Sequence, residues 1–211
     1  MSLLKAYLRL HEKIHPKTIG KFGPRMFEGL HPKNVFHFRS EFFIENVTRE
    51  DVVVDIACGT GLILHNLARH IQKGFGIEYS PKNVKLCKLK HSKPNLEFIE
   101  GDLYHFDYAA FKARTHYTTA VLSHILEHVE KPTELLQKIA ADKVLICVPS
   151  QENWYRQLLI HLKLPYKSDP SHYREYTRPM LRAELEAAGY QVAFIGFNSE
   201  GEIVCKATLK N

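Results

Sequence analysis

Hydrophobic positions form two alternating patterns from residue 51 onward. Short runs rich in β-branched and aromatic residues are typical of strands buried on both faces, and segments with apolar residues every three or four positions are typical of helices. The predicted strands are 51–57, 74–80, 95–102, 118–125 and 142–150, followed by a final pair at 191–197 and 202–209. The predicted helices are 61–71, 81–89, 131–141 and 178–190, with Ser80 as the cap of the second.

Alternation of strands and helices at this interval indicates βαβ units. The expected fold is therefore α/β, a doubly wound and mostly parallel sheet closed by an antiparallel strand pair. Sheets of this kind bind their ligands at the carboxyl ends of the strands, close to the first strand-to-helix turn. We assign residues 41–211 to this domain.

Two segments lie outside the alternating pattern. Residues 2–14 have the spacing of an amphipathic helix, and 15–40 are interrupted by Pro and Gly, so residues 1–40 are interpreted as a helical arm that serves as a lid. The segment 152–177 is the longest insert between sheet elements. It contains an amphipathic stretch beginning at Trp154, which either packs on the sheet edge or covers the acceptor as a second lid.

Charge is distributed unevenly along the 211 residues. The formal net charge is +6, and residues 1–40, with eight Lys or Arg and two Glu, carry all of this excess. A charge run of this kind is commonly a solvated face. The functional alternatives are attraction of an acidic acceptor and weak attachment to an anionic membrane surface.

Several classes of protein are disfavoured by composition. No window approaches about 18 consecutive apolar residues, so we expect no membrane span. Charged residues interrupt the apolar residues of the first fifteen positions, so we expect no secretory leader. The four cysteines lie far apart without a CxxC pair, which favours a reducing compartment, the cytoplasm, and leads us to expect no metal site.

The turn after the first strand carries the main chemical signal, Asp55-Ile-Ala-Cys-Gly59-Thr-Gly61. The two glycines allow a sharp turn against which a ligand can lie. A dinucleotide fingerprint requires a third glycine at position 64, which is Leu, and Asp55 would repel a pyrophosphate. The loop therefore suits a cationic nucleoside without phosphates better than NAD, and an NAD-dependent oxidoreductase is disfavoured.

These residues resemble motif I of the class I S-adenosylmethionine-dependent methyltransferases, with Ala57 in place of the first glycine of the motif. Later segments, LSHILEHVEKP (122–132) and HYREYTRPMLRAELEAAGY (172–190), resemble the type 11/UbiE-like branch. The segment 31–47 is more loosely similar to methyltransferases of bacterial cell-surface polysaccharide clusters.

The resemblance implies S-adenosylmethionine as the cofactor and a set of residues that bind it. In this family an acid at the Glu78 position accepts hydrogen bonds from the ribose hydroxyls, Asp102 would bind the adenine amino group, and Leu103 would flank the ring. The complete implied set is Asp55, Ala57, Cys58, Gly59, Gly61, Glu78, Tyr79, Asp102, Leu103 and Ser123.

Candidates for the acceptor side are less specific. His124 and His128 follow the fourth strand, and an imidazole with a pKa near 6.5 can accept a hydroxyl proton at neutral pH, so both are candidate catalytic bases. A local structural role is the alternative for both. His172, Tyr173, Arg174 and Tyr176 form the candidate substrate-binding set, in which Arg174 would pair with an acceptor carboxylate or phosphate.

The sequence thus predicts methyl transfer to a small molecule or a glycan-type acceptor, most simply at oxygen. A catalytically silent binding protein with the same fold and an RNA or protein methyltransferase remain alternatives. Nucleic acid is disfavoured as a partner despite a pI near 9.0, because the segment after the fourth strand reads SHILEH and not the (D/N)PP(Y/F) motif of amino-methylating enzymes. No pattern indicates an oligomeric state.

Overall fold

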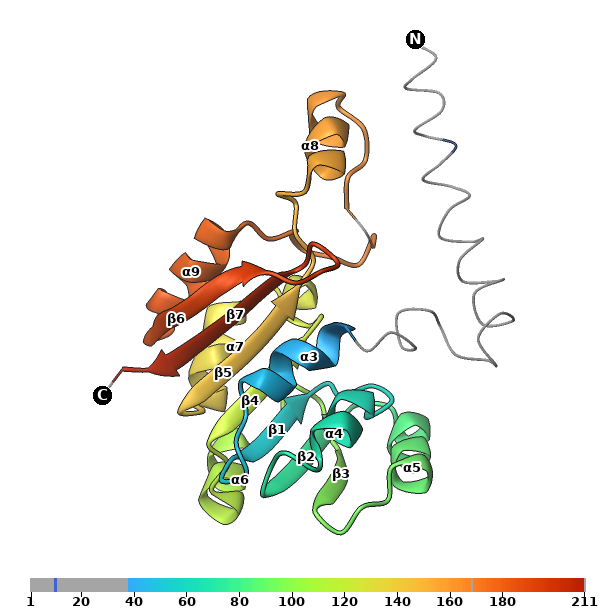
Figure 1. Ribbon diagram of the computed structural model, residues 1–211, viewed down its shortest axis with the longest axis vertical. Coiled ribbons are helices and arrows are strands. Elements are labelled where there is room, and N and C mark those ends of the chain that lie inside the picture. Colours follow the sequence, from blue (N-terminus) through green and yellow to red (C-terminus); the bar gives the residue numbers. More distant parts are fainter. Residues whose placement is uncertain (1–9, 11–37, 168, 211) are drawn as a thin grey trace.

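The computed structural model describes residue 10, residues 38–167 and residues 169–210 (Figure 1). Apart from residues 10 and 38–40, the predicted basic arm of residues 1–40 lies outside the described residues.

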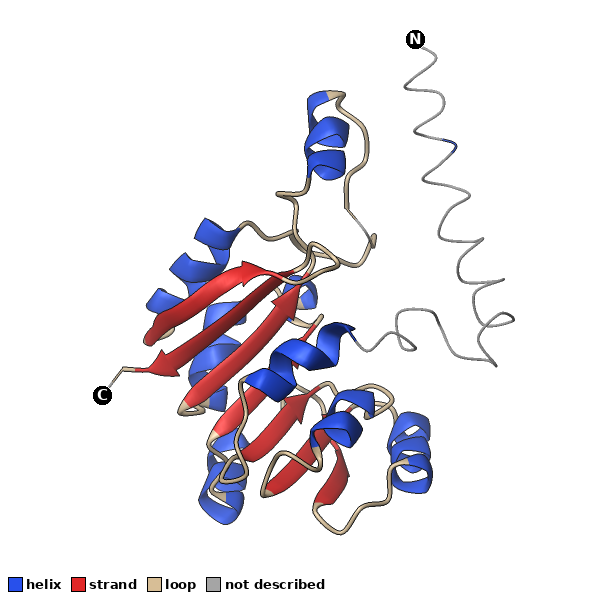
Figure 2. Ribbon diagram, viewed as in Figure 1, coloured by secondary structure: helices blue, strands red, loops and turns tan. Residues whose placement is uncertain are grey.

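A seven-stranded sheet forms the centre of the described domain (Figure 2). Its strands are β1 (Val52–Ile56), β2 (Lys73–Glu78), β3 (Leu96–Glu100), β4 (Thr119–Ser123), β5 (Lys143–Val148), β6 (Tyr190–Phe197) and β7 (Ile203–Leu209). Their order is β3-β2-β1-β4-β5-β7-β6, and β7 alone among these strands runs in the direction opposite to the other six. The predicted α/β fold with a closing antiparallel pair is confirmed.

Helices cover both faces of the sheet. They are α3 (Phe38–Glu45), α4 (Leu62–Leu67), α5 (Pro81–Lys90), α6 (Tyr108–Thr115), α7 (Pro132–Ile139), α8 (Trp154–His161) and α9 (Arg178–Ala187), with a short 3₁₀ turn, η1 (Leu126–His128). Residues of α3, α4 and α5 share one core cluster with the sheet, and residues of α6, α7 and α9 share the other.

The strand residues explain this layering. Val54 and Leu122 face the core cluster shared with α6, α7 and α9, whereas Val53 and Val121 face the cluster shared with α3, α4 and α5, because side chains alternate across a strand. A continuous β-branched run is therefore buried on both faces, as the sequence pattern predicts.

Helix α8 departs from this arrangement. It projects from the rest of the domain in Figure 1 and packs its own small apolar cluster, centred on Leu159 and Leu164. The insert 152–177 thus contains one short helix with a local core, and its role as a lid stays a prediction.

The predicted boundaries differ from the observed ones at several points. The predicted helix 61–71 is shorter in the structure, and the predicted strand 118–125 ends at Ser123. Helix α6 was not predicted. Its signals are Asp107, which caps the helix by accepting a hydrogen bond from the Ala110 N–H (2.9 Å), and the buried pair Tyr108 and Phe111. The predicted Ser80 cap is confirmed, since its hydroxyl accepts a hydrogen bond from the Asn83 N–H (3.4 Å).

Candidate active site

The glycine-rich turn joins β1 to α4 at the carboxyl edge of the sheet. Ala57, Gly59 and Gly61 all have positive φ, at 55°, 55° and 74°. A Cβ at Gly61 would lie 2.7 Å from the ring of Phe98 and 3.0 Å from the Cys87 sulfur, so the turn packs directly against β3 and α5. Among the described residues other than the two chain neighbours of Gly59, no atom lies within 4 Å of the corresponding position at Gly59, which leaves this side of the turn open to a ligand.

Asp55 lies in β1, immediately before this turn, and is almost completely buried. Burial, and after it the neighbouring Glu78 carboxylate, raises the pKa of Asp55 to about 8. Its Oδ2 atom accepts no hydrogen bond from the part of the chain that the structure describes. A buried carboxyl group in this state is suited to a cationic ligand, which would supply the missing partner and favour the ionised form.

Glu78 ends β2 and connects the two loops that border the site. Its carboxylate accepts hydrogen bonds from the backbone N–H of Gly59 (3.0 Å) and of Ser80 (2.9 Å), and from the Asn83 side chain (3.3 Å). Each carboxylate oxygen has more than one acceptor direction, so hydroxyl donors of a ligand can share it. Tyr79 beside it is exposed.

We expect Glu78→Gln to weaken binding of S-adenosylhomocysteine by about 10- to 100-fold. The charged carboxylate acceptor becomes a neutral amide, and the new NH₂ group would face the backbone N–H of Gly59 or Ser80, which is also a donor. Isothermal titration calorimetry measures this change. Glu100→Gln is the matched control, since Glu100 is exposed on β3 in register with Glu78. Equal affinity of the Glu78→Gln variant and the wild type would show that this carboxylate does not bind the cofactor.

The third strand brings Asp102 and Leu103 to the same edge. The Tyr104 N–H (2.8 Å) and the His105 N–H (3.2 Å) donate hydrogen bonds to the Asp102 carboxylate. The backbone hydrogen bond from Tyr104 is the main cause that lowers the pKa of Asp102. Leu103 is partly buried against the core. Since β3, β2, β1 and β4 are neighbours and parallel, the implied cofactor residues, with Ser123 at the end of β4, lie along one edge of four strands.

Cys58 lies within this turn but is poorly suited to nucleophilic chemistry. Burial raises the pKa of its thiol well above the usual range, so the thiol stays protonated at neutral pH. The side chain acts as a small group in the turn, and its predicted place in the cofactor site stays a prediction.

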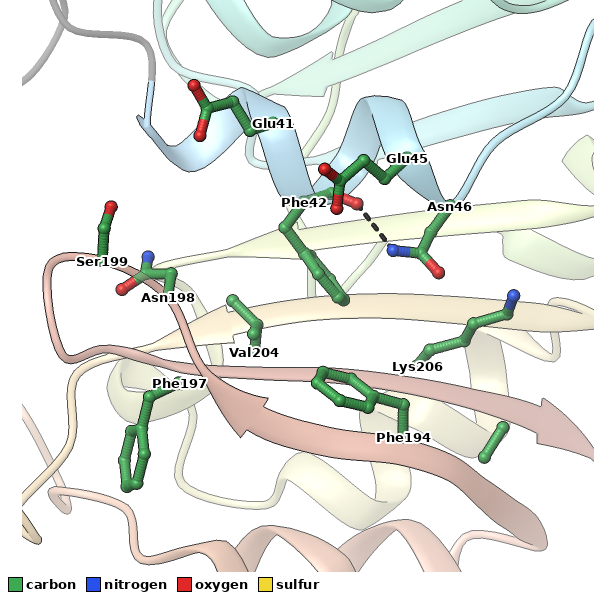
Figure 3. Close-up of a pocket in the computed structure, with 11 residues that line it drawn as sticks. Glu41, Phe42, Glu45, Asn46, Phe194, Phe197, Asn198, Ser199, Val204 and Lys206 are labelled. Atoms are coloured by element: carbon green, nitrogen blue, oxygen red, sulfur yellow. Dashed lines mark hydrogen bonds between the residues drawn. The ribbon is translucent and has the colours of Figure 1, made fainter.

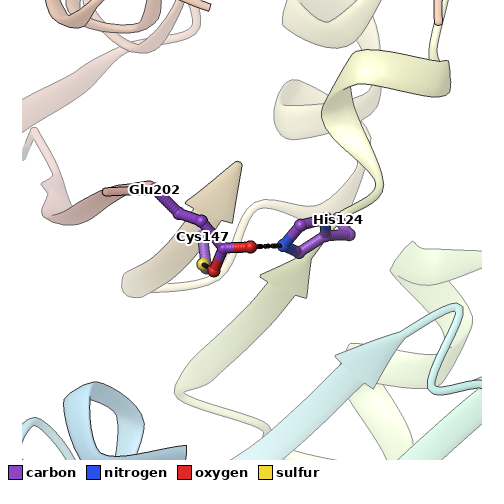
Figure 4. A group of neighbouring side chains, drawn as sticks. All are labelled: His124, Cys147 and Glu202. Atoms are coloured by element: carbon purple, nitrogen blue, oxygen red, sulfur yellow. Dashed lines mark hydrogen bonds and ion pairs between the residues drawn. The ribbon is translucent and has the colours of Figure 1, made fainter. Parts of the chain in front are cut away.

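His124 follows Ser123, the last residue of β4, and has a positive φ of 55°, a conformation that is costly for a residue with a Cβ. Its Nε2 atom lies 2.9 Å from a Glu202 oxygen, and its Nδ1 atom lies 3.4 Å from a Glu127 oxygen. Figure 4 shows the imidazole facing Glu202, whose other oxygen accepts a hydrogen bond from the Cys147 thiol (3.3 Å). The ring is thus held between two carboxylates from different segments.

A cavity of about 470 Å³ lies beside this pair. The side chains and backbone that form its wall belong to His124, His128, Pro149, Ser150, Asn153, Arg156, Asp169, His172, Glu200, Gly201 and Glu202. We call it the histidine cavity. It combines the end of β4, the segment after β5, the insert and the β6–β7 turn, four segments that are distant in sequence.

Two imidazoles meet in the histidine cavity at an edge-to-face angle. The rings of His128 and His172 are 4.5 Å apart, and both Nδ1 atoms have partners, the Ser171 hydroxyl (3.1 Å) and a Glu175 oxygen (3.0 Å) respectively. Burial, and after it the neighbouring His172, lowers the pKa of His128. The cavity thus presents imidazoles in fixed orientations.

The structure brings only part of the predicted acceptor set to this wall. His124, His128 and His172 line the cavity, whereas Tyr173, Arg174 and Tyr176 do not belong to its lining. Arg174 pairs with a Glu184 oxygen (3.2 Å), and the fully buried Tyr176 donates a hydrogen bond to the other Glu184 oxygen (2.6 Å). Tyr173 is exposed, and its backbone N–H donates to the carbonyl of Glu127. These interactions give Arg174 and Tyr176 structural partners.

Sequence reasoning did not find the acids and amides of the cavity. Glu127 does not line the cavity but lies 3.4 Å from His124; it directly precedes His128, so the HILEH run itself could have indicated it. Asn153, Arg156 and Glu202 lie in segments without a motif, and only the folded chain places them beside His124.

A second cavity of about 540 Å³ lies between α3 and the β6–β7 hairpin (Figure 3). Phe42 and Phe194 form its apolar part, with ring centroids 6.4 Å apart. It contains no histidine among its lining residues, and Glu41, Glu45 and Lys206 supply its charged groups. The histidine cavity is therefore better suited to proton transfer.

The strand order, the glycine turn after β1 and the acids at the ends of β1, β2 and β3 define a class I S-adenosylmethionine-dependent methyltransferase fold. A family model described as a methyltransferase domain matches residues 27–193, and the chain belongs to this family. It accordingly has a methyltransferase domain with the fold of enzymes that use S-adenosylmethionine. The UbiE-like branch within the class stays a prediction.

Solved structures show the same fold. Magnesium protoporphyrin IX methyltransferase of Synechocystis PCC 6803, with bound S-adenosylhomocysteine, has a TM-score of 0.66 at 18% identity, covering 93% of this chain and 100% of that one. A Haloferax volcanii methyltransferase in complex with the Trm112 activator has a TM-score of 0.66 at 16% identity, covering 85% and 92%. At these identities the likeness concerns the fold.

Among curated proteins, a Thermococcus gammatolerans protein named "Probable ribosomal RNA small subunit methyltransferase A" is 22% identical over 119 residues, 54% of this chain and 43% of that protein. The chain spans less than half the length of the curated relatives that it matches. Within the described residues, no helix has the length and apolar character needed to cross a membrane.

Proposed function

We propose that this methyltransferase acts on a hydroxyl group of a small molecule or glycan-type acceptor held in the histidine cavity. The observation that carries the proposal is the position of the cavity. It adjoins the end of β4, and β4 pairs with β1, the strand that bears Asp55. A cavity of about 470 Å³ falls within the size range of small-molecule sites.

The chemistry of the wall supports an oxygen acceptor. The bound cofactor supplies a methyl group on a sulfonium, a good leaving group, so the protein mainly aligns the acceptor and excludes water. When a neutral hydroxyl oxygen gains the methyl group, its proton must leave, and an imidazole of the wall accepts it. His124 and His128 both line the cavity and are the proposed proton acceptors.

Methylation of ribosomal RNA is the second candidate function. It is favoured by the names of the curated relatives, two of which are ribosomal RNA methyltransferases. The two candidates differ in the size of the acceptor, because a nucleotide within RNA must be taken out of its stack to enter such a cavity.

A screen with cofactor labelled in the methyl group separates the two. We expect label in a methyl ether of a sugar, a phenol or a quinone precursor, and none in ribosomal RNA or ribosomal subunits. Label in RNA alone would replace the proposed function with the second candidate. A methylated amine or carbon as product would contradict the assignment to oxygen. Cytoplasmic localisation and an acidic acceptor belong to the same proposal.

We expect His124→Asn to lower kcat by about 10²- to 10⁴-fold while leaving the affinity for S-adenosylhomocysteine unchanged, because a proton acceptor is lost and the cofactor site is not touched. Asn tolerates a positive φ better than most residues, so the backbone is retained. His116→Asn is the matched control, since His116 has a φ of 53° and is exposed at the end of α6. Unchanged kcat in the His124 variant would remove this residue from the reaction.

A further inference from the structure

We propose that α5 and the loop that follows it bind the surface of an anionic lipid bilayer. Residues 81–96 contain five lysines and no Asp, Glu or Arg. The net charge of longer segments hides this stretch, because acids elsewhere in residues 41–211 balance its lysines. The inference goes beyond the proposed function and uses none of the residues that line the histidine cavity.

The lysines of α5 lie on its outer side. Lys82, Lys85, Lys88 and Lys90 are exposed, whereas the residues that the helix buries are Val84 and Cys87. Glu97 is the first acid after this stretch, and it lies 3.8 Å from Lys73 of β2. Within the described part of the chain, the four exposed lysines form no ion pair with a carboxylate. Their charges are therefore available to an anionic partner.

The position of α5 suits contact with a flat surface. The helix packs against β3, which is the strand at one edge of the sheet. Figure 1 shows α5 at the border of the described domain, on the side away from β6 and α9. A planar bilayer can therefore approach the outer side of this helix at the end of the sheet.

The side chains of this surface favour a bilayer over a nucleic acid. Leu89 is 78% exposed, and its spacing from Lys82 and Lys85 places all three on one stripe of the helix. An apolar side chain among lysines can enter the headgroup region of a bilayer. Residues 81–96 contain no Phe, Tyr or Trp on which bases could stack, and they lack Arg, the residue best suited to nucleic-acid recognition.

The basic surface continues beyond α5 into a cavity of about 390 Å³. Arg69 and Lys93 contribute positive charge to its wall, and Glu41 is the one acid among the described residues that line it. The rings of His65 in α4 and His91 after α5 lie 4.5 Å apart, so the two helices meet at this point. A cavity of this size is large enough for one phosphate-bearing headgroup beside the helix.

Sedimentation with lipid vesicles tests the inference on the full chain, with any affinity tag removed. We expect binding to vesicles of equimolar phosphatidylcholine and phosphatidylglycerol, none to phosphatidylcholine alone, and weaker binding as ionic strength rises. The combined variant Lys85→Gln, Lys88→Gln and Lys90→Gln should bind about 10- to 100-fold more weakly, because each lysine near an anionic surface contributes about fivefold. Leu89→Ser should weaken binding about two- to fivefold without changing its salt dependence, since it removes no charge.

The matched control neutralises three exposed lysines outside α5, as Lys138→Gln, Lys163→Gln and Lys210→Gln. The control and the α5 variant have the same net charge, and both retain residues 1–40, so a difference in vesicle binding between them reports on α5. Unchanged affinity for S-adenosylhomocysteine would show that both variants are folded.

Absence of vesicle binding by the wild type, or equal binding by the α5 variant and the control, would overturn the inference. Binding of polyuridylate that depends on the α5 lysines, without binding to vesicles, would assign this surface to RNA instead. Because no methyl transfer is measured, vesicle binding can succeed or fail independently of the proposed function.

Discussion

Asp55→Asn is expected to make the protein more stable at pH 8 while removing most of its affinity for the cofactor. Asp55 is buried, and its pKa is raised from an ordinary value of 3.8 to about 8 by burial and then by Glu78. When the pKa of an acid is higher in the folded state than in the unfolded state, the free energy of unfolding is highest at pH values below the unfolded-state pKa. This extra stability is lost as the pH rises from about 4 to about 8, because the unfolded chain ionises first.

Asparagine has nearly the same shape and cannot ionise, so the variant should not show this loss. A difference of about four pKa units corresponds to an upper limit on the order of 5 kcal/mol at pH 8, and to little difference near pH 4. Urea unfolding of both proteins at pH 5 and pH 8 measures the effect. The variant should also bind S-adenosylhomocysteine about 10- to 100-fold more weakly, because a charged hydrogen-bond acceptor is lost.

Asp102→Asn is the natural comparison, since hydrogen bonds lower the pKa of Asp102 and its substitution should change stability in the opposite direction. Equal pH dependence of unfolding in the Asp55 variant and the wild type would contradict the account of Asp55. Higher stability together with unchanged cofactor affinity would leave the electrostatic argument intact and remove Asp55 from the cofactor site.

Gly61→Ala is expected to be the most destabilising single substitution in the glycine turn, by about 3 kcal/mol. Two costs add. A residue with a Cβ at a φ of 74° loses about 1–2 kcal/mol, and the new methyl group would lie 2.7 Å from the Phe98 ring, which requires the core to shift. Chemical denaturation measures the change in the free energy of unfolding.

Gly59→Ala provides the matched control. Gly59 also has a positive φ, of 55°, but no atom of the described residues beyond its chain neighbours lies within 4 Å of its Cβ position, so only the backbone cost of about 1–2 kcal/mol applies. Its methyl group would instead enter the open side of the turn and weaken cofactor binding. If both variants lost the same stability, packing of Gly61 against β3 and α5 would not be the cause.

The strand edge that carries the glycine turn, where we expect the cofactor, could be predicted from sequence because its signals are local. A β-branched run followed by two glycines predicts a buried strand and a tight turn, and Asp55 and Glu78 belong to strands that pair directly. Parallel strands bring their carboxyl ends together, so spacing along the chain was sufficient to predict one shared edge.

The acceptor half could not be predicted in the same way because its residues meet only through tertiary contacts. Glu202 reaches His124 from a hairpin near the end of the chain, and Arg156 reaches Glu175 across the insert. The sequence suggested Arg174 and Tyr176 as acceptor contacts, whereas in the structure both interact with Glu184. The spacing of residues along the sequence does not show whether a polar side chain, such as that of Arg174, pairs with another residue of the protein or is available to bind an acceptor.

The reversed direction of β7 divides this methyltransferase into two parts that can change independently. Because β7 runs against β6, the turn at residues 198–202 returns to the same edge as the glycine loop, yet it shares none of the strands that hold Asp55, Glu78 and Asp102. Under the proposed function, exchange of this turn and of the insert between homologous enzymes is expected to transfer acceptor preference and to leave methyl-donor binding unaltered. The hairpin is thus the natural place for new specificities to arise, and the first segment to graft in an engineered enzyme.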